Sequence, residues 1–83
     1  MLEYIIEIPK TQLVLNFVST CIEATARLYN VSYKDIFDRM KRVGMIENYI
    51  VPNYEALHSQ SREILAADMM ECLKNWEAKQ WNN

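Results

Sequence analysis

The sequence predicts a small all-α protein, a bundle of four or five helices, and three observations lead to that prediction. Apolar residues recur at spacings of three and four in several segments, as in helices that bury one face. One glycine and two prolines among 83 residues are too few for an architecture rich in β-turns. Hydrophobic residues make up 51% and charged residues 24% of the chain, a balance typical of a folded domain. We therefore expect residues 1–83 to form one helical domain.

The N-terminal residues 1–9 are expected to be extended or loosely ordered. Isoleucines and a partial alternation of apolar and polar residues favour an extended segment before Pro9. The first helix is predicted over residues 11–29, and Asn30 is suited to end it in the left-handed conformation. One face of this helix is expected to be buried, with Leu15 outside it. That face comprises Leu13, Phe17, Cys21, Ala24 and Leu28, widened by Val14, Val18 and Ile22.

Two shorter helical segments are expected next. Ser32 begins the first of them, with Asp35 three residues further on in a variant of the capping box. Gly44 is the only glycine, and we expect it to take the left-handed conformation at the end of this helix. Residues 45–51 predict a short helix that ends at Pro52. The inward-facing residues of the first segment are expected to be Ile36, Phe37 and Met40, with Val43 a further candidate.

The C-terminal third predicts one short turn and one long helix. Asn53 is expected to cap a turn that runs to His58, and the polar residues 59–61 are expected to form a loop. The last helix should run from about residue 62 to 79, or begin nearer residue 66 if residues 63–65 are extended. Residues 80–83 are expected to form a frayed tail. The buried stripe is predicted to be Leu65, Met69, Cys72 and Trp76, with Met70 and Leu73 beside it.

The charge distribution leaves nucleic-acid binding only as an alternative. The net charge is −2, and the one basic segment, residues 32–44, carries four cations and two aspartates. The candidate nucleic-acid contacts are Lys34, Arg39, Lys41 and Arg42. A weak helix-turn-helix around Gly44 would read DNA with residues 45–51, which contain Glu47 and no Lys or Arg. We therefore expect these cations to form a solvated helix face and do not expect a nucleic-acid partner.

Nothing in the sequence specifies a catalytic or metal site. His58 is the only histidine, and the chain lacks a Gly-x-Ser-x-Gly elbow and a glycine-rich phosphate loop. Cys21 and Cys72 lie in apolar helical patterns without a Cys-x-x-Cys pair, so they are expected to be small buried residues in a reducing compartment. We expect no enzyme activity, no cofactor and no metal. His58 is instead expected to form a hydrogen bond at a helix end.

The same reasoning excludes a membrane partner and predicts a cytoplasmic protein. The longest uncharged apolar stretch, residues 13–22, is too short to span a bilayer. The first seven residues contain two acids where a secretory signal needs Lys or Arg.

Four short motifs occur in a fixed order: Phe17-Val-x-x-Cys-Ile-Glu23, then Val31-Ser32 with Ile36-Phe37, Gly44-Met-Ile-x-x-Tyr49, and Tyr54-x-x-Leu-His-Ser59. Together they resemble an uncharacterised family of short bacterial proteins, a domain of unknown function with a Tyr-x-x-Leu-His-Thr signature. The resemblance covers residues 13–75, and the Asp-Ile helix of the family corresponds here to Ala67-Asp68-Met69. Ser61 stands where that family usually has glycine, and Ile64 where it often has an aromatic residue.

The resemblance implies an all-α fold and a cytoplasmic setting, and it supplies no catalytic residues. Genes of that family often lie beside genes for ADP-ribosyltransferase-like proteins, which implies a partner or an antitoxin-like role. We therefore expect a non-catalytic protein-interaction or regulatory module, with a homodimer left open. Tyr54, Leu57 and His58 are the candidate residues for contacting a partner or shaping the loop. Tyr4, Tyr33 and Trp81 are further candidates for exposed contacts.

Overall fold

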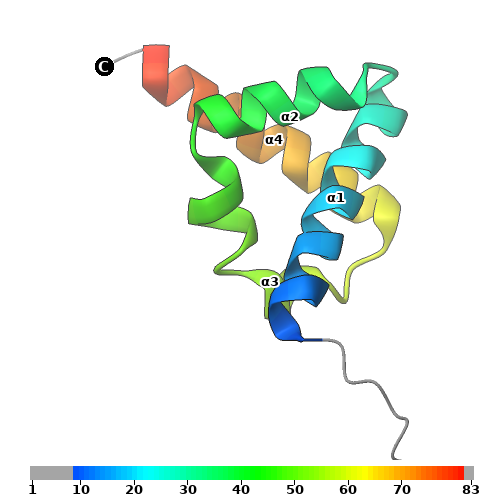
Figure 1. Cartoon of the computed structure of the whole chain (residues 1–83). Helices are drawn as coiled ribbons and strands as arrows, with labels where there is room; N and C mark the ends of the chain where they lie inside the picture. Colours follow the sequence, from blue (N-terminus) through cyan, green and yellow to red (C-terminus); the bar gives the residue numbers. More distant parts are fainter. Residues whose placement is uncertain (1–8, 82–83) are drawn as a thin grey trace, which may run out of the picture.

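The computed structural model describes residues 9–81, which fold into five helices without a strand among them (Figure 1). This confirms the predicted all-α bundle of four or five helices. The expected extended segment before Pro9 and the last two residues of the expected frayed tail lie outside the described residues. None of the helices in residues 9–81 is long and apolar enough to cross a bilayer. The helices are α1 (Lys10–Tyr29), α2 (Tyr33–Arg42), the π-helix η2 (Ile46–Ile50), α3 (Tyr54–Leu57) and α4 (Arg62–Trp81).

The core lies between the two long helices, which cross each other in Figure 1. α1 packs chiefly against α4 and to a lesser extent against α2. All five helices contribute side chains to a single apolar cluster, which includes Leu57 from the single turn of α3. The largest fully buried apolar side chains of this cluster are Ile22, Ile36, Met40, Met45, Ile50, Met69 and Leu73.

The buried face of α1 is the predicted one in the middle of the helix, where Cys21 and Ala24 are buried and Phe17 packs against the core, but not at its two ends. Leu13 and Leu28, at the two ends of the predicted stripe, are 38% and 50% exposed, so their assignment to the core was wrong. Val18 and Ile22, which were expected to widen the face, are buried beside Cys21, because α4 and α2 cover the middle of this 20-residue helix and not its first and last turns. Leu15 is exposed, as predicted. The buried residues of α1 are Val18, Cys21, Ile22, Ala24, Thr25 and Ala26.

Thr25 is a polar residue in the centre of this buried face. Its hydroxyl is fully buried and donates a hydrogen bond of 2.7 Å to the carbonyl of Cys21, one turn earlier. A buried hydroxyl that finds a backbone acceptor avoids the cost of an unsatisfied donor. The apolar pattern did not predict that Thr25 is buried, because only apolar residues were assigned to the buried face.

Local sequence signals place the ends of α1 and α2 correctly. Asn30 adopts φ 55°, ψ 47° after α1, and the following N–H of Val31 reaches the carbonyl of Ala26 at 3.0 Å, as in a Schellman motif. Ser32 then accepts a hydrogen bond of 3.0 Å from the N–H of Asp35 and so caps α2. After α2, Gly44 takes φ 72°, and a Cβ at that position would lie only 3.0 Å from the Asn48 amide nitrogen. The positive φ therefore favours glycine there, whereas the end of the flexible Asn48 side chain could move to make room for a Cβ.

The segment predicted as a short helix over residues 45–51 is a π-helix for most of its length. The N–H of Val51 donates to the carbonyl of Ile46 at 3.0 Å, five residues back. Asn53 does not cap α3 with its side chain, contrary to the prediction. Its amide instead donates to the carbonyl of Tyr49 at 2.7 Å and so satisfies an acceptor at the end of η2.

α4 is helical from Arg62 onward, so the alternative of an extended stretch over residues 63–65 was wrong. Ser61 accepts a hydrogen bond of 3.3 Å from the N–H of Ile64 and begins the helix. α4 continues to Trp81, two residues past the predicted end. Of the predicted stripe, Leu65 and Met69 are buried together with Met70 and Leu73, while Cys72 and Trp76 are half-buried.

An ion pair between Arg39 and Glu77 ties α2 to α4. The guanidinium donates two hydrogen bonds of 2.8 and 2.9 Å to the two carboxylate oxygens, and the side chains are 25% and 23% exposed. Paired hydrogen bonds of this kind are stronger than a simple surface contact between charges. The hydrogen bonds from Arg39 are the main reason that the pKa of Glu77 lies below its ordinary value of 4.5. Gln80 extends the contact by donating to the carbonyl of Arg42 at 3.2 Å.

Replacing Glu77 with Gln should lower the free energy of unfolding by about 1–2 kcal/mol, since the half-buried Arg39 loses its charged partner. A carboxyl with a lowered folded pKa stabilises the protein above its unfolded pKa, here 4.5, and loses that stabilisation as the pH falls through the folded value. The difference between wild type and Glu77→Gln in urea unfolding should therefore be complete at neutral pH and shrink in acid.

Asp38→Asn is the matched control, because it removes one carboxylate from the exposed Lys34–Asp38 pair on α2. We expect a clearly smaller effect from this change. Equal effects of the two substitutions at neutral pH would contradict the special role of the Arg39–Glu77 pair.

Candidate functional site

Tyr54, Leu57 and His58, the residues singled out from the sequence, come from α3 and the residue after it, and they point in different directions. Leu57 enters the apolar core and is buried. The Tyr54 ring lies edge-on to Phe17 of α1, with ring centroids 5.4 Å apart, and stacks on the His58 ring at 4.6 Å. His58 is exposed. The three residues therefore attach the single turn of α3 to α1 and leave one imidazole at the surface.

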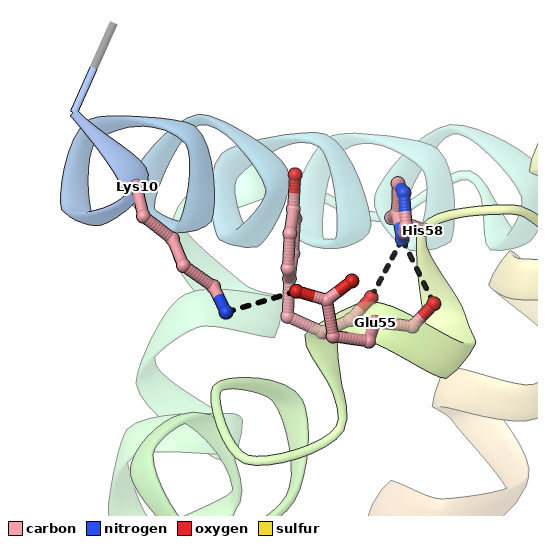
Figure 2. A network of polar contacts seen from close by, with 4 residues as sticks. Lys10, Glu55 and His58 are labelled. Carbon is pink, nitrogen blue, oxygen red and sulfur yellow. Dashed lines mark hydrogen bonds and ion pairs between the residues drawn. The ribbon is translucent and has the colours of Figure 1, made fainter.

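The hydrogen bonds of His58 fix which ring nitrogen carries a proton. Nδ1 lies 2.9 Å from the carbonyl oxygen of Tyr54 and 3.0 Å from that of Glu55, and both partners can only accept (Figure 2). Nδ1 must therefore donate, which leaves Nε2 as the free nitrogen of the neutral ring. The imidazole closes the C-terminal end of α3, as predicted for a histidine at a helix end.

A second contact joins α3 to the first turn of α1. Figure 2 shows the Lys10 ammonium reaching the Glu55 carboxylate, at 2.9 Å. The hydrogen bond between them raises the pKa of Lys10 and lowers the pKa of Glu55 from their ordinary values. Both side chains are exposed, so we regard the pair as a means of orienting the two elements.

An apolar groove lies beside this ion pair and has a volume of about 370 Å³. We call it the α1 groove, and Lys10, Thr11, Val14, Leu15 and Val51 line it. Leu15 is 56% exposed and Val51 is 40% exposed, although both are large apolar residues. The sequence placed Leu15 outside the buried face, but it carried no signal that Val51, 36 positions later, would lie next to it.

The four cations of α2 are largely engaged within the chain. Lys34 pairs with Asp38 at 2.7 Å, and Arg39 pairs with Glu77. The Lys41 ammonium lies 5.8 Å from the centroid of the Phe37 ring, within the range of a cation–π contact. Among residues 9–81, Arg42 has no ion-pair partner. Three of the four belong to the last turn of α2, where positive charge favours the helix dipole.

The two cysteines of the described residues lack the environment of a reactive thiol. Cys21 and Cys72 are free thiols. Burial raises the pKa of Cys21 to about 12, and it also raises the pKa of the half-buried Cys72. Thiols with raised pKa values are poor nucleophiles at neutral pH. No three His, Cys, Asp or Glu side chains within residues 9–81 are grouped as metal ligands.

Tyr4 and Trp81, two of the three residues predicted as exposed contacts, cannot be compared with the structure. Tyr4 precedes the described residues, and the side chain of Trp81 is not described. Tyr33 is described, and it is exposed. Its hydroxyl lies 3.2 Å from the Ser19 hydroxyl on α1, so the ring is tethered across the turn between α1 and α2.

His58→Ala should lower the free energy of unfolding by about 0.5–2 kcal/mol, because the carbonyls of Tyr54 and Glu55 lose their donor and Tyr54 loses a stacking partner. Thermal or urea unfolding of wild type and variant measures this change.

Gln60→Ala is a suitable control, since Gln60 is exposed two residues further on and its side chain forms no hydrogen bond with a described residue. An unchanged unfolding curve for His58→Ala would show that the imidazole has no structural role and would point to a binding role instead.

Comparison with known proteins places most of the chain in a family. Residues 16–76 match the model of a family described as Protein of unknown function (DUF3791). No curated protein and no solved structure matches the chain.

Proposed function

Because the chain belongs to the DUF3791 family of proteins of unknown function, we propose its role from its surface: a non-catalytic protein-interaction or regulatory module. The observation that carries the proposal is the α1 groove, an apolar surface at the edge of the bundle. Exposed large apolar side chains that gather in a groove, with polar groups at the rim, are typical of protein-binding surfaces. Lys10 and Glu55 provide such a rim here.

The signature residues Tyr54, Leu57 and His58 support the α1 groove by fixing the position of α3. Tyr54 packs against Phe17 on α1, and Leu57 anchors α3 in the core. α3 is thereby held in a fixed position relative to the first turns of α1, where the α1 groove begins. A rigid surface reduces the conformational entropy lost on binding. In this proposal Tyr54, Leu57 and His58 shape the surface, and the exposed ring of His58 is also within reach of a partner.

We further propose an antitoxin-like role, in which the chain binds an ADP-ribosyltransferase-like protein encoded beside it in a bacterial cytoplasm. This part rests on the resemblance of the sequence motifs and on the gene neighbourhood that the resemblance implies. It agrees with a small chain that offers an apolar surface groove to a partner.

Leu15→Glu should weaken binding of the neighbouring gene product at least tenfold, which is about 1.4 kcal/mol, because a carboxylate would be buried in an apolar contact. Isothermal titration calorimetry with the purified neighbour measures the affinity, and its rate of NAD consumption reports inhibition. Leu15 is an exposed position, so the stability of the chain should change by no more than about 0.5 kcal/mol.

Ile64→Glu is the matched control, because Ile64 is 56% exposed like Leu15 but lies on α4 and does not line the α1 groove. Equal loss of affinity in both variants, or full affinity in Leu15→Glu, would contradict the proposed surface.

A second copy of the chain is the alternative occupant of the α1 groove. Light scattering across a concentration series separates the two cases, using the full chain, Leu15→Glu and a chain that begins at Lys10. A mass that doubles with concentration in the full chain but not in Leu15→Glu would assign the groove to a homodimer. A constant monomer mass leaves the groove to a different protein.

The alternative of a DNA-binding regulator is supported less well by the contacts of α2. Two of its four candidate cations already neutralise carboxylates of the same chain, and a third lies over the Phe37 ring. Binding to a phosphate backbone would compete with these contacts.

A further inference from the structure

We propose that a second groove, beside α4, binds the side chain of a lysine or arginine presented by a protein partner. This groove has a volume of about 670 Å³, within the range of roughly 300–1,000 Å³ that ligand sites occupy. We call it the α4 groove, and its lining includes Tyr49, Asp68, Glu71, Asn75, Trp76 and Lys79. The α4 groove shares no residue with the α1 groove. The proposal rests on the proposed function as an interaction module and adds the chemistry of one segment of the partner.

The helical period of α4 gathers these groups on one side. Asp68, Glu71 and Asn75 follow one another at steps of three and four, and Trp76 and Lys79 lie on adjoining rows. Tyr49 of η2 also lines the groove, next to Trp76. The sequence alone suggested Trp76 as a core residue, and the structure places it at the border between core and groove.

Two aromatic rings form the apolar part of the groove. Tyr49 and Trp76 are half-buried, and their rings meet edge-on with centroids 6.2 Å apart and planes inclined by 67°. Both are packed against the core, which holds them in place. Aromatic faces attract ammonium and guanidinium groups, tryptophan most strongly.

The two carboxylates of the groove have no cationic partner among the described residues. Asp68 and Glu71 form no ion pair within residues 9–81, which they share with Asp35, Glu47 and Glu63, but only these two lie together in one groove. Asp68 is also half-buried. Burial is the main reason that the pKa of Tyr49 is raised, and electrostatic interactions, including one with the Asp68 carboxylate, add to it. The negative charge of Asp68 is therefore felt at the ring.

The charge of the groove selects a cation rather than an anion or a neutral group. The lining contains two carboxylates, Asp68 and Glu71, and one ammonium, Lys79, so its net charge is −1. Lys79 forms no ion pair with a described residue and would compete with an incoming cation. The aromatic walls favour an organic cation over a metal ion, and the groove does not group three metal-ligating side chains among the described residues.

The test is a titration of the ¹⁵N-labelled full chain, followed by NMR, with the peptide acetyl-Ala-Arg-Ala-amide. We expect shift changes centred on the Trp76 indole and on the amides of Asp68 and Glu71. The peptide acetyl-Ala-Gln-Ala-amide should leave these signals unchanged. Equal shifts from both peptides, or shifts from the arginine peptide that lie outside the α4 groove, would overturn the proposal.

Removing a negative or a positive charge from the α4 groove should change the dissociation constant of the arginine peptide in opposite directions. A general loss of structure would weaken binding in every variant. Asp68→Asn or Glu71→Gln should raise the dissociation constant about threefold, and Lys79→Gln should lower it by a similar factor, as expected for single charges at a partly exposed site. Glu63→Gln, on the same helix but outside the groove, should have no effect. An equal effect of Glu63→Gln would show attraction to the net charge alone and would refute a specific site.

Leu15→Glu separates this inference from the proposed function, because Leu15 belongs only to the α1 groove. The arginine peptide should bind Leu15→Glu as it binds wild type. If the peptide fails to bind wild type while partner binding still depends on Leu15, this inference alone is refuted.

Discussion

Packing of the middle of α1 against α4 is the contact on which the rest of the structure depends. Cys21 and Ile22 share one apolar cluster with Met69 and Leu73, more than 40 residues later in the chain. Burial of each large apolar side chain contributes about 1.5–3 kcal/mol, and no other pair of elements offers two helices of 20 residues to share it. The short elements α2, η2 and α3 each add one or two buried side chains to this cluster and gain their position from it.

Polar contacts then orient the short elements around the two long helices. Arg39 and Glu77 set α2 against the second half of α4, and Lys10 and Glu55 set α3 against the first turn of α1. The two proposed grooves lie next to these contacts: the α1 groove includes Lys10, and the α4 groove ends near Glu77 at Trp76 and Lys79. Ion pairs at the edge of the apolar core therefore orient the elements that form both grooves.

The candidate site could be predicted only in part, and its three signature residues show why. A lone histidine after an apolar turn suggested a hydrogen bond at a helix end, and that contact depends only on residues three and four positions away. The position of Tyr54 between His58 and Phe17 depends on a contact across 37 positions, for which the sequence has no local signal. The same holds for Val51 beside Leu15 and for Tyr49 beside Trp76.

The sequence by itself determined the helical class and the ends of most helices. Asn30, Ser32 and Gly44 act through backbone conformations and hydrogen bonds that reach no more than a few residues along the chain. The helix ends that they form can therefore be predicted from the local sequence. The tertiary structure alone decided how much of the predicted face of α1 is buried, that residues 46–50 form a π-helix, and which charges are paired. The periodicity of α1 predicted a broad apolar face, and the position of α4 buried its middle, with Val18, Cys21 and Ile22, while Leu13 and Leu28 in the end turns stay exposed. The extent of burial is decided by the surface of a second element, and that surface exists only once the chain has folded.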